Sequence, residues 1–103
     1  MEKTALTRET LLSVLREQAD EIRERFKVRS LGLFGSFAND EARVDSDIDM
    51  LVEFEQPSFD NYMDLKFFLE DLLGRTVDLV MKDTLKPRIK QRILKEVKNV
   101  QGL

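Results

Sequence analysis

Two aspartates, Asp47 and Asp49, stand two residues apart in the stretch DIDMLVEF, residues 47–54. Alternate residues of an extended strand point to the same face, so these two carboxylates would lie side by side. Neighbouring carboxylates repel each other unless a cation holds them together. Because the chain has no histidine and no cysteine, that cation would be one that prefers oxygen ligands, such as magnesium.

A third acidic residue, Asp78, lies in the otherwise apolar stretch TVDLVM, residues 76–81. An isolated charge is costly to bury, which indicates that this carboxylate has a functional role. If the strand that contains Asp78 pairs beside residues 47–54, the carboxylates of Asp47, Asp49 and Asp78 converge on one point. Three oxygen donors on rigid strands suit one or two magnesium ions.

The pair Gly35-Ser36 supplies a second element of a site, directly after the strand-like stretch RSLGLF, residues 29–34. A glycine followed by the start of a helical turn exposes free backbone N–H groups, which bind phosphate. Gly35 lets the backbone approach a ligand closely, and Ser36 adds a hydroxyl group. A turn that binds phosphate beside carboxylates that bind metal is typical of phosphoryl or nucleotidyl transfer.

Each of these residues also has a purely structural interpretation. A Gly-Ser pair is common in loops, and an Asp-x-Asp pair can be the solvated end of a strand. Asp45, in the same acidic stretch, is interpreted as a turn or strand-end residue, and Asp78 alone could be a salt-bridged strand residue. The occurrence of all these features together at this spacing favours the chemical interpretation.

The composition excludes several classes of function. Without histidine, the chain has no Ser-His-Asp or Cys-His nucleophile and no histidine-ligated metal site. A net charge of −3 argues against direct nucleic-acid binding by the chain as a whole. The sequence shows neither a signal peptide nor a run of about 20 apolar residues that would cross a membrane, which predicts a cytoplasmic protein.

The candidate site needs a frame of strands and helices. The spacing of apolar residues predicts helices over residues 7–27, over residues 59–73, and from Pro87 to about Lys98 with Ile89, Ile93, Val97 and Val100 inward. Strands are predicted at residues 29–34, 47–54 and 76–81, with Thr7 and Ser58 as helix N-caps. A length of 103 residues predicts one domain. The simplest packing is a small sheet of about three strands with helices against it.

A family resemblance follows from these motifs. Gly35-Ser36, ten further residues and Asp47-Ile48-Asp49 match GS-x10-DxD, the signature of nucleotidyltransferases of the DNA polymerase beta superfamily. The wider run GSFANDEARVDSDIDMLVEF, then VDLV, then LKPRIKQRILKEV closely resembles the minimal nucleotidyltransferase (MNT) domains, and the third acidic residue of that family maps onto Asp78. In the turn, many members have Ala-Arg-Gly-Glu-Ala where this chain has Ala38-Asn39-Asp40-Glu41-Ala42.

This resemblance implies a fold and roles for the site residues. It implies an α+β fold of the polymerase beta type, with a small mixed sheet of about three strands, flanking helices, and residues 1–103 as a single MNT domain. The donor would be ATP, with two magnesium ions. Asp47 and Asp49 would hold the metals and the triphosphate, and Asp78 would bind the catalytic metal and help to deprotonate the acceptor hydroxyl. Gly35 and Ser36 would hold the β- and γ-phosphates.

The resemblance also implies a partner. MNT proteins of this size commonly pair with a HEPN-domain RNase toxin, and some neutralise it by adding AMP to a tyrosine hydroxyl. The leading hypothesis is therefore a magnesium-dependent nucleotidyltransferase that transfers AMP from ATP to a hydroxyl of a HEPN toxin and acts as its antitoxin, in a hetero-oligomer. One alternative is an antitoxin that neutralises its partner by binding alone. Another is a small-molecule nucleotidyltransferase of the aminoglycoside type, whose acceptor pocket would need another domain or subunit.

Overall fold

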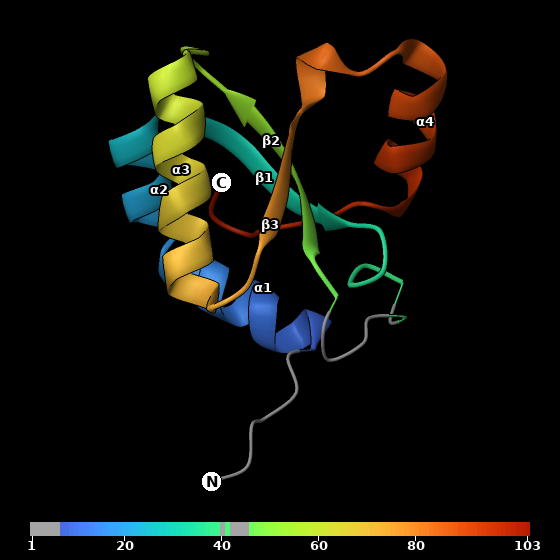
Figure 1. Cartoon of the computed structure of the whole chain (residues 1–103), viewed down its shortest axis with the longest axis horizontal. Coiled ribbons are helices and arrows are strands. Elements are labelled where there is room, and N and C mark those ends of the chain that lie inside the picture. Colours follow the sequence, from blue (N-terminus) through green and yellow to red (C-terminus); the bar gives the residue numbers. More distant parts are fainter. Residues whose placement is uncertain (1–6, 40, 42–45) are drawn as a thin grey trace, which may run out of the picture.

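The computed structural model describes residues 7–39, 41 and 46–103, and it has an α+β fold in which helices flank a four-stranded sheet (Figure 1). Asp45 lies outside the described residues. No helix in these ranges is long and apolar enough to span a lipid bilayer. In chain order the elements are α1 (Arg8–Glu17), α2 (Ala19–Phe26), β1 (Val28–Phe34), β2 (Ile48–Phe54), α3 (Phe59–Leu73), β3 (Val77–Met81), the 3-10 helix η1 (Lys82–Thr84), α4 (Pro87–Glu96) and β4 (Lys98–Asn99).

The sheet is mixed, and its strand order is β3-β2-β1-β4. Strand β1 runs antiparallel to β2 and to β4, whereas β3 runs parallel to β2. Strands β2 and β3 therefore lie side by side, as the predicted convergence of Asp47, Asp49 and Asp78 requires. Strand β3 is an edge strand, and α3 provides the connection that a parallel pair requires.

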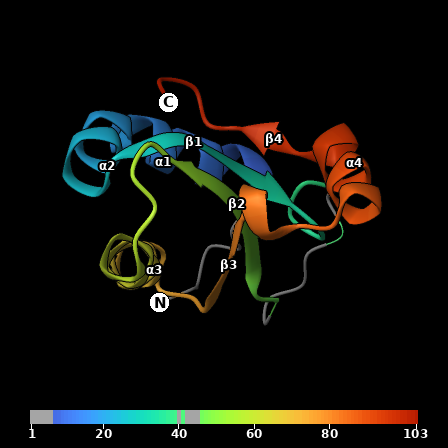
Figure 2. The same cartoon turned by 90° about the horizontal axis from the view of Figure 1, so that it is seen from above.

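The hydrophobic core lies between one face of the sheet and the helices α1, α2 and α3. Alternate residues of β2 face this core, as predicted: Ile48, Met50, Val52 and Phe54. The two ribbon views agree that α2 and α3 lie toward one side of the sheet and α4 toward the other (Figures 1 and 2). The face of β2 that carries Asp49 is thus turned away from the main core.

The helices begin where their capping residues predict. The Thr7 side chain accepts a hydrogen bond from the Thr10 N–H at 3.1 Å, and the Ser58 side chain accepts one from the Asn61 N–H at 3.0 Å. Gly74 ends α3 in the left-handed conformation, with φ of 66°. This cap directs the chain from α3 into β3, the strand that carries Asp78.

The prediction of a single helix over residues 7–27 is wrong, because the structure has two helices that meet at Gln18. Gln18 leaves the helical conformation, with φ of −98° and ψ of 6°. The break lets Leu15 of α1 and Ile22 of α2 both lie fully inside the core. It also brings Phe26 against Phe68 of α3, with 5.1 Å between the ring centroids. Side-chain spacing alone does not reveal such a break, since the apolar residues recur across it.

The prediction of about three strands is also corrected, because β4 forms a fourth where the last helix was expected to continue. Helix α4 ends at Glu96, and Val97 is extended, with φ of −64° and ψ of 137°. A side chain at Gly32 of β1 would come within 2.6 Å of Val97, so the glycine permits the close approach of β4. Val100 is buried because it follows this strand, whereas Ile89, predicted to face inward, is 43% exposed.

Candidate active site

Asp49 and Asp78 lie on the face of the sheet opposite the main core, on adjacent strands. They are register partners in the parallel pair β2–β3. Their neighbours along each strand, Met50 and Leu79, are buried, so both carboxylates point away from the core. Asp78 is exposed rather than buried because β3 is at the edge of the sheet. Because Asp78 is exposed, the cost of burying a charge is no evidence for its function. The evidence for its function is its position beside Asp49.

The surroundings raise the pKa of the Asp49 carboxyl above its ordinary value. Burial has the largest effect, because it disfavours the charged form. The charges of Asp78 and Asp47 act in the same direction, and so does a hydrogen bond between the Asp49 and Asp78 side chains. The three aspartates named by the sequence thus interact electrostatically, and Asp49 is at their centre.

The turn that begins at Gly35 lies directly against Asp49. Phe34, the last residue of β1, is the register partner of Asp49 in β2. Gly35 has φ of +71°, and a Cβ atom built on it would overlap Oδ2 of Asp49. A residue with a side chain would meet both a conformational and a steric obstacle there. The structure therefore brings together the turn and the acidic residues that the sequence named separately.

Residues 35–39 and Glu41 form the predicted turn. The Asn39 N–H donates to the Gly35 carbonyl at 3.2 Å, and the Glu41 N–H donates to the Ser36 carbonyl at 2.8 Å. The N–H groups of Ser36 and Phe37 meet no acceptor among residues 7–39, 41 and 46–103. Free N–H groups at the start of a helical turn attract anions. Phe37 is buried in the core and fixes the turn in place.

The donor chemistry of this site fits a hard divalent cation, since all its ligating atoms would be carboxylate oxygens. Asp49 and Asp78 provide two such groups in contact, and Asp47, exposed just before β2, is close enough for its charge to act on Asp49. In the part of the chain that the structure describes, no three acidic side chains converge tightly enough to enclose a metal ion. Asp49 and Asp78 are thus the two candidate ligands already in contact, and Asp47 would be a further ligand.

Two residues that sequence reasoning missed, Arg75 and Glu96, lie around the turn. Arg75, in the connection from α3 to β3, donates to the Ser46 carbonyl at 2.9 Å, and its guanidinium lies 5.6 Å from the centroid of the Phe37 ring. It therefore joins the segment before Asp47 to the turn. Glu96, the last residue of α4, accepts hydrogen bonds from the Gly35 N–H and from the Asn39 side chain. No local sequence signal marks these contacts, because they join segments far apart in the chain.

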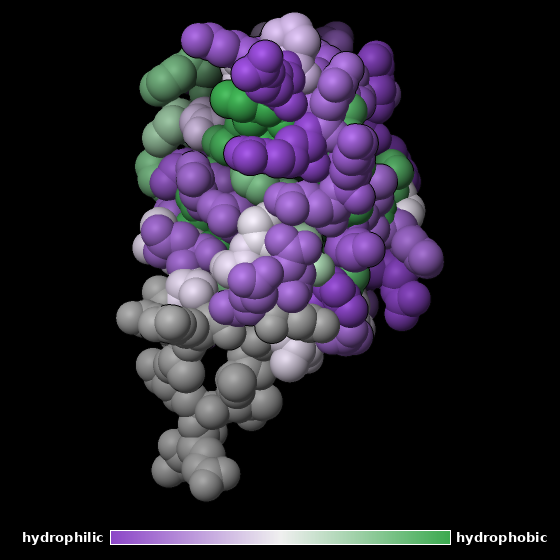
Figure 3. Space-filling view, turned by 90° about the vertical axis from the view of Figure 1, so that its right-hand side faces the viewer, coloured by the Kyte–Doolittle hydropathy of each residue, from purple (hydrophilic) through white to green (hydrophobic). Residues whose placement is uncertain are grey.

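A groove on the same face of the sheet begins two residues along β2 from Asp49. Leu51 and Glu53 form part of its floor, and Leu94 and Val97 from the end of α4 form part of its wall. Its volume is about 330 Å³. Figure 3 shows the side of the molecule on which α4 lies, and its surface is mostly hydrophilic with smaller hydrophobic areas between.

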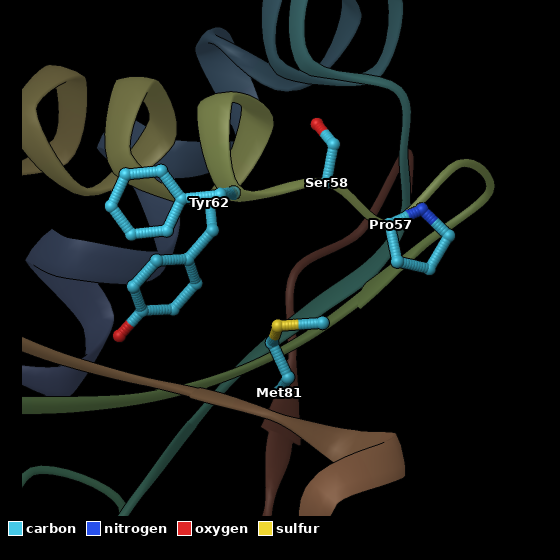
Figure 4. Close-up of a pocket in the computed structure, with 5 residues that line it drawn as sticks. Pro57, Ser58, Tyr62 and Met81 are labelled. Carbon is cyan, nitrogen blue, oxygen red and sulfur yellow. The ribbon is translucent and has the colours of Figure 1, made fainter.

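A second pocket lies at the opposite ends of the strands, where β3 finishes. Its lining is mainly apolar: Pro57, Ser58, Phe59, Tyr62 and Met81 (Figure 4). The Tyr62 hydroxyl donates to the Leu79 carbonyl at 2.6 Å, which ties the start of α3 to β3. None of the candidate site residues lines this pocket, so it is separate from the acidic site.

Asp49→Asn is expected to stabilise the metal-free protein slightly. Because the pKa of Asp49 is raised on folding, its ionised form costs folding free energy once the pH exceeds that pKa. The amide removes this cost at about pH 7, and the melting temperature should rise by about 1–3 °C after allowing for solvent screening. The gain should shrink as the pH falls toward the ordinary pKa of an aspartate and should vanish near about pH 2.5, where the carboxyl is protonated in the folded and the unfolded state.

Thermal unfolding followed by circular dichroism, with a chelator present, measures this effect at both pH values. Asp83→Asn, at an exposed position outside the site, is the matched control. A lower melting temperature for Asp49→Asn than for the wild type at neutral pH would contradict the electrostatic interpretation.

Known proteins resemble this chain in both sequence and fold. Residues 15–100 match the nucleotidyltransferase domain family. The protein adenylyltransferase MntA of Thermococcus cleftensis is 50% identical over 93 residues, which cover 89% of this chain and 94% of the relative. A solved structure assigned as a minimal nucleotidyltransferase is 37% identical, with a TM-score of 0.79, and the match covers 93% of this chain and 98% of that one.

A more distant solved structure shares the fold at 20% identity, with a TM-score of 0.63 and coverage of 89% of this chain and 73% of that one. That structure is of a tri-AMPylated HEPN toxin of Shewanella oneidensis in complex with an MNT antitoxin.

Proposed function

Because the chain belongs to the nucleotidyltransferase domain family, we propose that it is a protein adenylyltransferase that transfers AMP from ATP to a hydroxyl group of a HEPN-domain partner. We propose further that the reaction depends on magnesium and that residues 1–103 act as one nucleotidyltransferase domain. The observation that carries this proposal is the contact of the Gly35 turn with Asp49, which in turn lies beside Asp78. A phosphate-binding turn against a carboxylate pair gives the triphosphate and its metal one common point of attachment.

Each site residue has a defined role in this proposal. Gly35 and Ser36 hold the β- and γ-phosphates through the backbone N–H groups and hydroxyl of the turn. Asp47 and Asp49 would hold two magnesium ions together with the triphosphate, and Asp78 would be a ligand of the catalytic ion. When bound, the ions would neutralise the triphosphate and make the acceptor hydroxyl more acidic.

The proposed reaction forms one bond and breaks one bond. The acceptor oxygen bonds to the α-phosphorus, and the bond from that phosphorus to the oxygen bridging to the β-phosphate breaks. Pyrophosphate leaves, and the hydroxyl proton passes to Asp78. Asp78 suits a macromolecular acceptor because it is exposed on an edge strand, so a hydroxyl on another protein can reach it from the open edge of the sheet.

Two relatives support the choice of acceptor and partner. The 50% identical protein of Thermococcus cleftensis is a protein adenylyltransferase, and the fold neighbour from Shewanella oneidensis forms a complex with an AMPylated HEPN toxin. We therefore propose that this chain is an antitoxin that forms a hetero-oligomer with a HEPN toxin. A reaction that consumes ATP fits the cytoplasmic location predicted from the sequence.

An antitoxin that acts by binding alone is the second candidate. It is favoured by Asn39, which stands in the turn where many members of the family have arginine. A cation there would stabilise the phosphates, whereas the Asn39 amide instead donates to Glu96 at 3.3 Å. The carboxylate pair Asp49–Asp78 favours the enzyme, because a binding role gives no reason to hold two like charges together.

The fate of labelled ATP separates these candidates. The purified protein, its HEPN partner and magnesium are mixed with ATP that is labelled on either the α- or the γ-phosphate. The enzyme is expected to leave the α label on the partner and to release the γ label in pyrophosphate. Transfer of the γ label would indicate phosphoryl transfer instead, and a neutralised partner without label would indicate binding alone.

A further inference from the structure

The carboxylate of Glu96 lies over the turn that begins at Gly35. Glu96 is the last residue of α4, 61 positions from Gly35 in the chain. Its Oε1 atom accepts a hydrogen bond from the Gly35 N–H at 3.4 Å, and its Oε2 atom accepts one from the Asn39 side-chain amide at 3.3 Å. A negatively charged group therefore lies where the turn presents its N–H groups.

This position conflicts with the binding of a triphosphate. The Gly35 N–H is one of the donors that the proposed function gives to the phosphates, and it cannot serve a carboxylate and a phosphate fully at the same time. The two groups carry the same sign of charge, and Asp49 beside the turn adds to the repulsion. Both hydrogen bonds of Glu96 are long, so they are weak and a phosphate can replace them.

Helix α4 has little buried surface, so it can move when the Glu96 carboxylate leaves the turn. Only Ile93 of this helix is buried, while Ile89 and Leu94 are 43% and 41% exposed. Both ribbon views place α4 away from the helices that cover the core (Figures 1 and 2). The chain after the helix is held independently, since the Val100 N–H donates to the Leu31 carbonyl at 2.8 Å. The helix can therefore shift while the sheet stays intact.

We propose that Glu96 competes with the triphosphate for the Gly35 turn, so that nucleotide binding displaces its carboxylate and loosens α4 from the body of the protein. This inference rests on the proposed function, because it assumes that the turn binds the phosphates of ATP. Glu96 thereby lowers the affinity for nucleotide and makes the position of α4 depend on whether ATP is bound.

The test compares two variants of Glu96 by calorimetric titration with ATP and magnesium. Glu96→Gln removes the charge and keeps an acceptor oxygen for the Gly35 N–H, and Glu96→Ala removes both. Competition predicts that both variants bind nucleotide more tightly than the wild type, by about threefold to tenfold. Glu24→Gln, on the exposed surface of α2, is the matched control for the change in net charge and should bind as the wild type does.

A role for Glu96 as a mere brace of the turn predicts a different pattern. In that case Glu96→Gln would bind nucleotide as the wild type does, and Glu96→Ala would bind it more weakly, which would overturn the proposal. If the wild type and Glu24→Gln bind ATP and Glu96→Gln binds no more tightly, only this inference falls. If the wild type binds no ATP with magnesium, the proposed function falls, and this inference falls with it.

Hydrogen exchange of the unmodified wild-type protein provides a second measurement that does not depend on the folding of a variant. Amides of α4 should exchange faster after saturation with a non-hydrolysable ATP analogue and magnesium, while those of β1 and β2 should not. Slower or unchanged exchange in α4 would overturn the proposal.

Discussion

Replacement of both Asp47 and Asp49 by asparagine is expected to lower the affinity for ATP with magnesium by about a hundredfold or more. Each substitution removes an anionic ligand for the metal, and charge-assisted contacts of this kind contribute on the order of 2 kcal/mol apiece. Asp49 lies at the centre of the acidic cluster, against the Gly35 turn, so its loss affects the metal and the phosphates together. Calorimetric titration with ATP and magnesium measures the change directly.

The fold should survive this double substitution, because asparagine has nearly the same shape as aspartate. The melting temperature of the metal-free variant should equal or exceed that of the wild type, since repulsion at Asp49 falls. Titration with ATP in the presence of a chelator is the control, because there the two proteins should differ much less. Equal affinity of the variant and the wild type for ATP with magnesium would exclude the aspartates as metal ligands.

Asp78→Asn is expected to slow AMP transfer by about a thousandfold while partner binding persists. The substitution removes the group that accepts the proton of the acceptor hydroxyl, and it weakens the contact of that hydroxyl with the metal. General base catalysis and metal-ion catalysis each typically make a large contribution to the rate. Nucleotide binding should fall less than transfer, because Asp47, Asp49 and the Gly35 turn remain. Partner binding should persist because asparagine preserves the exposed surface of the edge strand β3.

Single-turnover transfer of the α label from ATP to the partner measures this rate. Asp83→Asn, a few residues further along the chain in η1, is the matched control and should transfer at the wild-type rate. A rate for Asp78→Asn within tenfold of the wild type, at saturating ATP, would remove Asp78 from the proposed mechanism.

Much of the frame of the site could be predicted from local signals. The alternation of apolar residues from Ile48 to Phe54 places Asp49 on the face of β2 opposite the core, and the structure confirms it. Capping residues such as Ser58 and Gly74 fix both ends of α3, and thereby the entry into β3. These signals are strong because each depends on a few neighbouring residues, whose preferences are set by backbone geometry.

The features that were missed depend on contacts between distant segments. Strand β4 has two residues, too few to show alternation, and it forms because Gly32 of β1 lets it approach. The break at Gln18 goes together with the packing of α2 against α3, and Gln18 itself carries no sequence signal for it. The contact of Glu96 with the turn exists only once β4 has brought the end of α4 back to β1. No local pattern contains that information.

The intact mass of the HEPN partner shows whether AMP is transferred to it. The partner is weighed by mass spectrometry after incubation with the wild-type protein, ATP and magnesium, and again after incubation with a chelator in place of magnesium. If the protein is a magnesium-dependent adenylyltransferase, the partner gains the mass of one or more AMP groups on a tyrosine, serine or threonine, and the chelator prevents the gain. A partner that is neutralised with no gain in mass would rule out AMP transfer and identify the protein as an antitoxin that acts by binding alone.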